Sequence, residues 1–156
     1  MTQQDKQLLL QDLCTRLPYG VKVLNMAEGV NEVCELDSIL TSRKHKDKIF
    51  VFLTIPDDSV MAGIEMVKPY LRSMSSMTEE ESAELSNIIS EWFDKELFYL
   101  TEESFLRYAL SKINYSINPL LFDWLNAHHF DYRGLIPKGL AIAITESNNP
   151  YKTLKT

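Results

Sequence analysis

Cysteine and glycine are scarce in this sequence, and their scarcity excludes several kinds of site. The five glycines are too dispersed to form a GxGxxG turn or a P-loop that would cradle a phosphate. The two cysteines, Cys14 and Cys34, lack Cys-x-x-Cys spacing and fall within apolar periodic patterns, so we expect both to be buried, reduced thiols. The sequence therefore predicts no cofactor and no disulfide.

Long hydrophobic runs are also absent. The first seven residues are polar, and the apolar run that follows, residues 8–10, is too short for a signal-peptide core or a membrane span. We therefore expect a cytoplasmic protein without membrane contact.

Positive charge is in deficit, with 16 Lys and Arg against 22 Asp and Glu and a formal net charge of -6. Nonspecific binding to nucleic acid depends on clustered cations, and the basic run at residues 43–48 is short and lies between two apolar runs. We interpret this run as a solvated turn. A nucleic-acid-associated regulator stays an alternative that would need a clustered basic surface.

The composition that remains is an ordinary globular mixture, with 45% hydrophobic and 24% charged residues. A chain of this length buries roughly 68–70% of its unfolded surface and needs no disulfide to form a core. We therefore predict a single domain over residues 1–156. It has a β-rich part at 20–72, a helical part at 78–129 and a polar tail at 147–156.

The first half of the chain reads as one helix followed by strands. Apolar side chains at helical spacing predict an amphipathic helix over residues 3–17, which Pro18 ends. Strand patterns follow at residues 21–23, 32–41 and 49–55, with a reversal near Glu28 and Gly29 and an edge strand before residue 72. In residues 32–41 we place Cys34, Leu36 and Leu40 on one face, and Val33, Glu35, Asp37 and Ile39 on the other. The continuous apolar run at 49–55 suits a central strand covered on both faces.

The second half contains helix-start signals. Thr78 and Glu81 have the spacing of a capping box, and an apolar stripe follows from Leu85 through Trp92 and Phe93. A second start lies at residues 101–103, and Asn118 before Pro119 is a third. Residues 140–145 read as a short final strand.

The order of these elements predicts the fold class. Strands precede helices instead of alternating with them, which argues against a doubly wound parallel sheet. We predict an α+β fold with an N-terminal helix, a small antiparallel meander that could curl into an SH3-like half-barrel, and a helical C-terminal half with a short final strand.

Residues 120–136 concentrate a Trp, two of the three histidines and several other aromatic residues, so they are the first candidate for a catalytic site. On a helical wheel, His128 falls within the apolar arc and His129 at its edge, whereas Asp123 and Asn126 lie on the opposite side. Within one helix, neither histidine can use Asp123 as an orienting carboxylate. Adjacent histidines also point in divergent directions, and we predict no metal site. We expect a core His128 with a backbone partner and a partly exposed His129.

The loop after this helix is the better candidate for function. It contains Tyr and Arg, which are enriched in interface hot spots, and we predict a binding surface formed by His129, Asp131, Tyr132 and Arg133. A plainer interpretation is a helix C-cap and a loop that packs Phe130 and Tyr132 onto the sheet. The competing catalytic hypothesis is a small hydrolase or metal-dependent enzyme that uses His128 or His129 with Asp131 and a third group, such as His45 or an Asp.

Three blocks of the sequence resemble a family. They are LCTRLPYGVKV at residues 13–23, KPYLRSMSSMT at 68–78 and the segment from Asp123 to Ile136, and together they cover about a quarter of the chain. They are similar to short uncharacterised proteins encoded by gut bacteria and by their phages and integrated elements, in which proline commonly stands where this chain has Ser73. The resemblance implies phage or mobile-element cargo in a bacterial cytoplasm and supplies no catalytic residues. The sequence as a whole favours a non-enzymatic binding or adaptor protein with a protein partner.

Overall fold

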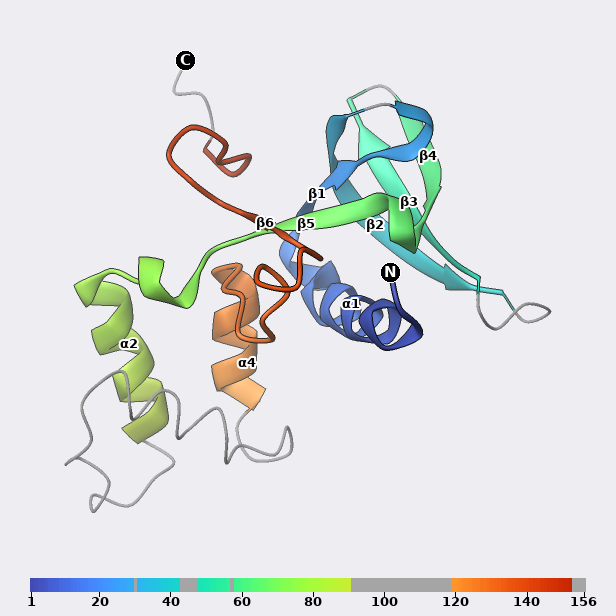
Figure 1. Ribbon diagram of the computed structural model, residues 1–156. Coiled ribbons are helices and arrows are strands. Elements are labelled where there is room, and N and C mark those ends of the chain that lie inside the picture. The colour runs from blue at the N-terminus through green and yellow to red at the C-terminus, as the bar shows by residue number, and fades with distance from the viewer. Residues whose placement is uncertain (30, 43–47, 57, 91–118, 153–156) are drawn as a thin grey trace.

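Figure 1 shows the computed structural model of the chain, which describes residues 1–29, 31–42, 48–56, 58–90 and 119–152. The protein has an N-terminal helix, a six-stranded and mostly antiparallel sheet, and further helices. The predicted α+β class is therefore confirmed.

Helix α1 (Gln3–Arg16) begins at a capping box that the sequence analysis did not predict. The Asp5 amide donates to Thr2 Oγ1 at 3.1 Å, and the Thr2 amide donates to the Asp5 carboxylate at 3.1 Å. The helix ends before a 3-10 turn, η1 (Leu17–Tyr19), because Pro18 removes a backbone donor. Gly20 then adopts a left-handed backbone conformation with φ 61°, which leads the chain into the sheet.

The sheet has the strand order β4-β3-β2-β1-β5-β6. Its strands are β1 (Lys22–Asn25), β2 (Glu32–Thr41), β3 (Ile49–Ile55), β4 (Asp58–Gly63), β5 (Val67–Leu71) and β6 (Ile142–Ala143). The 3-10 turns between them are η2 (Ala27–Gly29), at the predicted reversal, and η3 (Ile64–Met66). All neighbours are antiparallel except β6, which pairs in parallel with β5.

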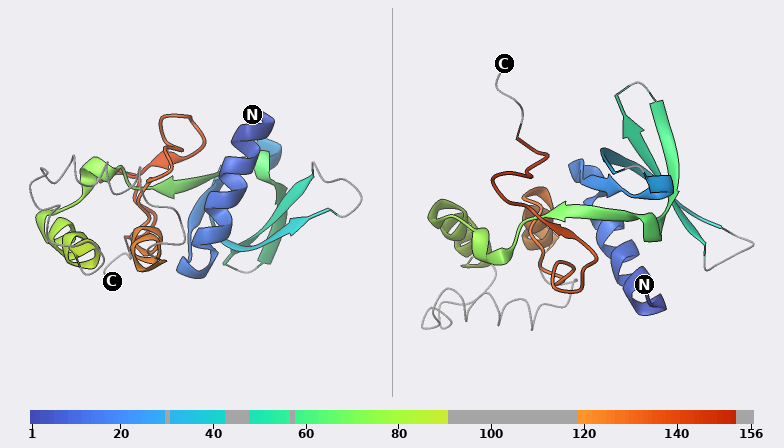
Figure 2. Two further views of the ribbon diagram at one scale, coloured as in Figure 1. Left: turned by 90° about the horizontal axis from the view of Figure 1, so that it is seen from below. Right: turned by 45° about the horizontal axis from the view of Figure 1, so that its top comes forward.

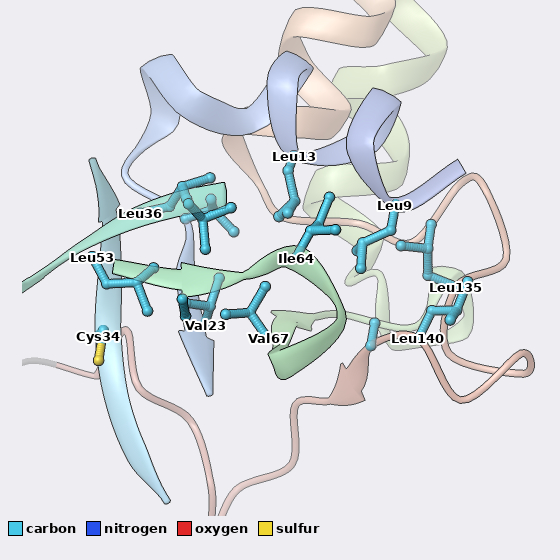
Figure 3. Packing of buried hydrophobic residues seen from close by; sticks show 14 of the residues in the cluster. Leu9, Leu13, Val23, Cys34, Leu36, Leu53, Ile64, Val67, Leu135 and Leu140 are labelled. Carbon is cyan, nitrogen blue, oxygen red and sulfur yellow. The ribbon is translucent and has the colours of Figure 1, made fainter. Parts of the chain in front are cut away.

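Strands β1 to β5 form a curved, open sheet (Figure 1), which we call the half-barrel. The long strand β2 pairs with β1 up to Glu35 and with β3 from Glu35 onward, so it belongs to both halves of the curled sheet. Among the described residues no pairing joins β4 to β5, and the barrel stays open there. Helix α1 lies against the inner side of the strands (Figure 2). In Figure 3, Leu9 and Leu13 point from α1 toward Ile64 and Leu36, which makes this the apolar core of the half-barrel.

The structure corrects two predictions about the faces of this sheet. The register of β2 against β3 shifts between Leu36 and Ser38, so Leu40 is exposed and Ile39 packs against the core, the reverse of the predicted arrangement. Strand β3 is not covered on both faces, since Phe50 and Phe52 on its outer side remain half-buried. Nor is β3 central, because only the edge strand β4 lies beyond it.

The helical half lies at the other end of the molecule from the β3–β4 hairpin (Figure 1). After η4 (Met74–Ser76) comes α2 (Glu79–Ser90), where the predicted capping box is confirmed by hydrogen bonds of 2.9 and 3.2 Å between Thr78 and Glu81. Helix α4 (Pro119–Ala127) begins where predicted, and α2 and α4 share a second apolar cluster. The basic run at 43–48, His45 within it, the stripe residues Trp92 and Phe93, and the helix start at 101–103 lie wholly or mainly outside the described residues.

Across the ranges that the structure describes, no helix combines the length and the apolar character needed to cross a bilayer.

Candidate functional site

The loop after α4 is attached to the end of β5 by its backbone. The Arg72 amide donates to the His129 carbonyl, and the Asp131 amide donates to the Arg72 carbonyl, each at 2.8 Å. The sequence blocks at residues 13–23, 68–78 and 123–136 meet here, since Arg16 and Arg72 each contact Phe130. The loop therefore lies where the half-barrel and the helical half join.

A buried ion pair on α1 anchors this loop. Arg16 and Asp12 are fully buried, and the guanidinium donates to both carboxylate oxygens of Asp12, at 2.7 and 3.1 Å. Arg16 Nη2 also donates to the Phe130 carbonyl at 2.7 Å. Arg133 approaches the same carboxylate, with Nε 3.4 Å from Asp12 Oδ1. One carboxylate on α1 thus fixes two arginines from different segments.

Asp131 shapes the rest of the loop. Its carboxylate accepts the Leu135 amide at 2.8 Å and the Ile136 amide at 2.7 Å, and its side chain is buried. These bonds satisfy backbone donors that would otherwise be buried without partners. We call Asp12, Arg16, Asp131 and Arg133 the polar joint.

His129 packs beneath the C-terminal segment. Its ring stacks on Tyr151 with centroids 4.0 Å apart, and its backbone is left-handed with φ 56°, which is uncommon for a residue other than glycine. Burial, assisted by the nearby positive charge of Arg16, lowers the pKa of His129 to about 4. The Tyr151 hydroxyl accepts the Lys22 amide at 2.9 Å and donates to the Tyr70 carbonyl at 3.2 Å.

His128 has the predicted backbone partner, since its Nδ1 lies 2.9 Å from the Trp124 carbonyl oxygen, but it is half-buried and does not belong to the core as predicted. Its ring stacks on Trp124 at 4.1 Å, and Trp124 stacks on Phe130 at 5.7 Å. The Arg72 guanidinium covers Phe130 at 4.2 Å and forms an ion pair with Glu81 at 2.5 Å. This hydrogen-bonded pair lowers the pKa of Glu81 to about 2.

These contacts bear on the catalytic hypothesis. Among the described residues, no hydrogen bond or ion pair joins His128 or His129 to a carboxylate, and no three His, Cys, Asp or Glu side chains are grouped to hold a metal ion. His129 Nδ1 and Arg16 Nη1 are both buried without a hydrogen-bond partner in the described part of the chain.

The four predicted binding residues lie together, but most of their polar atoms face inward. Asp131 bonds to backbone amides, Arg133 lies against Asp12, and His129 stacks on Tyr151. Tyr132 differs, because its ring borders a hollow between the end of α1 and helix α4. The hollow has a volume of about 350 Å³.

The walls of the hollow are mostly apolar. They consist of Pro18, Tyr19, Pro119, Phe122 and Tyr132. The Phe122 and Tyr132 rings pack against each other with centroids 5.4 Å apart and a tilt of 53°. Such a wall favours an apolar or aromatic surface of a ligand.

Four polar side chains complete the lining: Cys14, Thr15, Asp123 and Asn126. Asn126 is 3% exposed; its Oδ1 accepts the Tyr132 hydroxyl at 3.1 Å, and its Nδ2 has no hydrogen-bond partner among the described residues. Asp123 is exposed at the rim beside Tyr19, and burial together with this carboxylate raises the pKa of the Tyr19 phenol. Cys14 is exposed, which corrects its predicted burial, whereas Cys34 is buried as predicted.

Sequence reasoning missed Cys14, Tyr19, Asp123 and Asn126 as candidate site residues. A signal for two of them was present, because the helical wheel places Asp123 and Asn126 on the polar side of α4. That side borders the hollow. No sequence signal pointed to Cys14 in α1 or Tyr19 in η1, because these residues line the hollow only through the packing of α1 next to α4.

Comparisons of this chain with protein-family models, with curated proteins and with solved structures found no match.

Proposed function

We propose that this protein is a non-enzymatic binding protein whose hollow between α1 and α4 receives part of a protein partner. The observation that carries the proposal is the Asn126 side chain, which is almost fully buried, lines the hollow and has an amide donor without a partner in the described part of the chain. Nδ2 is not among the fully buried atoms that lack a hydrogen-bond partner in the described part of the chain, so it stays accessible for donating to a group in the hollow. Such a hydrogen bond contributes about 0.5–1.5 kcal/mol net.

The polar joint supports the same proposal by holding both walls in place. Asp12 and Arg16 lie on α1, next to Cys14 and Thr15, and Arg16 bonds to the loop that follows α4. Tyr132 is fixed through its hydroxyl bond to Asn126. A preformed site of this kind loses little conformational freedom when it binds.

The catalytic alternative has less support in the arrangement of the histidines. His128 is engaged with the Trp124 backbone and ring, and His129 is stacked under Tyr151. Asp131 is the suggested partner of these histidines, but both of its carboxylate oxygens accept hydrogen bonds from backbone amides. A binding role requires none of these groups to act as a base.

The setting of this function is part of the proposal. The family resemblance favours a phage or mobile-element product that acts on a protein of the bacterial cytoplasm. A nucleic-acid-associated regulator is less well supported, because no Lys or Arg borders the hollow in the described part of the chain.

Affinity purification from a gut-bacterial lysate tests the proposal, using the native chain and two variants of α1. Cys14→Trp places a bulky ring in the hollow, and Gln7→Trp adds the same ring at an exposed position two turns away on the same helix. We expect native and Gln7→Trp proteins to recover the same partner and Cys14→Trp to lose it. Equal recovery by a folded Cys14→Trp protein would place binding elsewhere.

Substitutions at Tyr132 or Arg133 are poorer tests of binding. Tyr132 bonds to Asn126, and the Arg133 guanidinium lies against the Asp12 carboxylate. Their removal would disturb the joint itself, so a lost partner could reflect a lost structure.

A further inference from the structure

We propose that the part of the partner that enters the hollow is a lysine or arginine side chain, with its cationic head at Asp123 and its aliphatic stem along Phe122. This inference rests on the proposed function and names the chemistry of that site.

The charges around the hollow favour a cation. Asp123 is the charged side chain among the lining residues, and it lies exposed at the rim. No hydrogen bond or ion pair joins its carboxylate to a basic group among the described residues, and the Tyr19 phenol interacts with it. A carboxylate next to an apolar wall attracts a cation more strongly than one in open solvent, because the wall limits screening by water.

The apolar walls fit the stem of such a side chain. Lysine and arginine carry three or four methylene groups that pack on apolar surface while the head stays near water. The Phe122 ring and Pro18 offer that surface, and Asp123 follows Phe122 directly in the chain. The aromatic rings add cation–π attraction for a head that passes close to their faces.

Two cations nearby restrict where the head can lie. The Arg16 and Arg133 guanidinium groups lie 5.4 and 5.0 Å from the centroid of the Tyr132 ring, and both are held by Asp12. Their positive charge disfavours a third cation over Tyr132. The head therefore belongs at the Asp123 and Tyr19 side of the hollow, which no Arg of the described ranges lines.

The Asn126 amide explains why the occupant is part of a peptide and not a free amine. Its Nδ2 has no acceptor among the described residues, and neither an ammonium nor a guanidinium can accept a hydrogen bond. The volume of about 350 Å³ leaves room for the peptide group that bears the side chain, whose carbonyl oxygen can accept from Nδ2. An acidic side chain would be repelled by Asp123, and a purely apolar one would leave the carboxylate desolvated.

The test uses the full chain and three acetylated, amidated glycine pentapeptides that carry lysine, arginine or norleucine at the centre. Norleucine keeps the aliphatic stem and removes the charge. Binding is followed by amide chemical shifts of Asp123 and Asn126 and by the alkylation rate of Cys14, an exposed thiol in the hollow. Cys34, which is buried, is the internal control for unfolding.

We expect the lysine or the arginine peptide to shift these amides at millimolar concentration, to slow Cys14 alkylation, and to bind less tightly as salt rises. Asp123→Asn should weaken binding about fivefold, in the range of an exposed ion pair strengthened by an adjacent wall. Asp37→Asn removes the same charge from an exposed site on β2 that does not border the hollow, and it should leave binding unchanged.

The outcomes separate this inference from the proposed function. Equal binding of the norleucine and lysine peptides, or full binding by Asp123→Asn, overturns the cationic occupant. If Cys14→Trp still abolishes capture of the lysate partner, the binding function survives that result. If Cys14→Trp captures the partner normally while lysine peptides bind at Asp123, the hollow takes cations but does not receive the partner.

Discussion

The protein has two buried regions that are built from opposite chemistry. The interior of the half-barrel is apolar, with α1 contributing Leu9 and Leu13. The polar joint is just as inaccessible at Asp12 and Arg16, yet it consists of charges. Neighbouring positions of one helix, Asp12 and Leu13, point into the two regions. Helix α1 therefore has two roles, since it fills the apolar core on one side and fixes the hollow on the other.

The two regions should respond differently to substitution. Apolar packing depends on volume and tolerates a change of shape, whereas a buried charge depends on the presence of its partner.

Asp12→Ala should be the most damaging change. It leaves Arg16 and Arg133 buried without their shared carboxylate, and breaking a buried pair costs about 3–5 kcal/mol. Urea unfolding measures the loss in free energy of unfolding. The double variant Asp12→Leu with Arg16→Met should recover part of the loss, because it leaves fewer buried charges unpaired. A loss below about 1 kcal/mol for Asp12→Ala would place the pair among weak surface bridges.

Leu13→Ala should cost about 2–4 kcal/mol, because it opens a cavity in the half-barrel. Conservative replacements at these two positions compare the importance of side-chain volume with that of charge. Leu13→Met keeps the volume and should cost less than about 1.5 kcal/mol. Asp12→Asn keeps the shape but not the charge, and it should cost more than Leu13→Met in the same urea series. The opposite order would mean that shape matters more than charge in the joint.

The stability of the protein should fall in mild acid through His129, which lies next to the polar joint. Burial depresses its folded pKa to about 4, below the unfolded value of 6.5, so its contribution is complete above about pH 6.5 and is lost as pH falls toward 4. We expect about 2 kcal/mol of this loss between pH 7 and 4.5. His129→Asn, which tolerates the left-handed backbone, should lack that part of the slope. Equal slopes in urea unfolding for both proteins would exclude His129 as the cause.

Glu81→Gln should have the smallest effect, about 1 kcal/mol, because the Arg72–Glu81 pair is partly exposed and solvent screens it. The pKa of Glu81 is lowered to about 2, so its contribution is present above about pH 4.5 and is lost as pH falls toward 2. Thermal unfolding at pH 7 and pH 3 measures both effects. A decrease in stability at pH 7 as large as that of Asp12→Ala would remove the distinction between exposed and buried pairs.

The sequence predicted the apolar region better than the charged one. Periodicity located α1, and the capping box of Thr78 and Glu81 located α2, because both signals are local. The faces of β2 could not be predicted beyond Leu36, since a bulge reverses them and depends on pairing with β3. The polar joint was also out of reach. Its contacts link Asp12 to Arg133 and Arg16 to Phe130 across more than a hundred residues.

The difference between local signals and long-range contacts also explains why the candidate site was predicted only in part. The sequence drew attention to residues 129–133 by composition, and the structure places them together at the joint. Composition cannot say which side of a loop faces inward. Of the four predicted residues, Tyr132 alone borders the hollow. Asp123 and Asn126, from the polar side of α4, border it as well.

Buried charges, in this account, stabilise the polar joint as a unit that can open independently of the apolar core. Amide hydrogen exchange is the direct test of this independence. We compare the amides of Phe130 and Asp131 in the loop with those of Val51 and Leu53 in β3, in native, Asp12→Ala and Leu13→Ala proteins. We expect Asp12→Ala to lower the free energy of opening at both sets and Leu13→Ala to lower it at β3 alone, because the joint can open while Leu13 stays packed. If both variants lower both sets equally, the joint and the half-barrel form one cooperative unit, and the claim is contradicted.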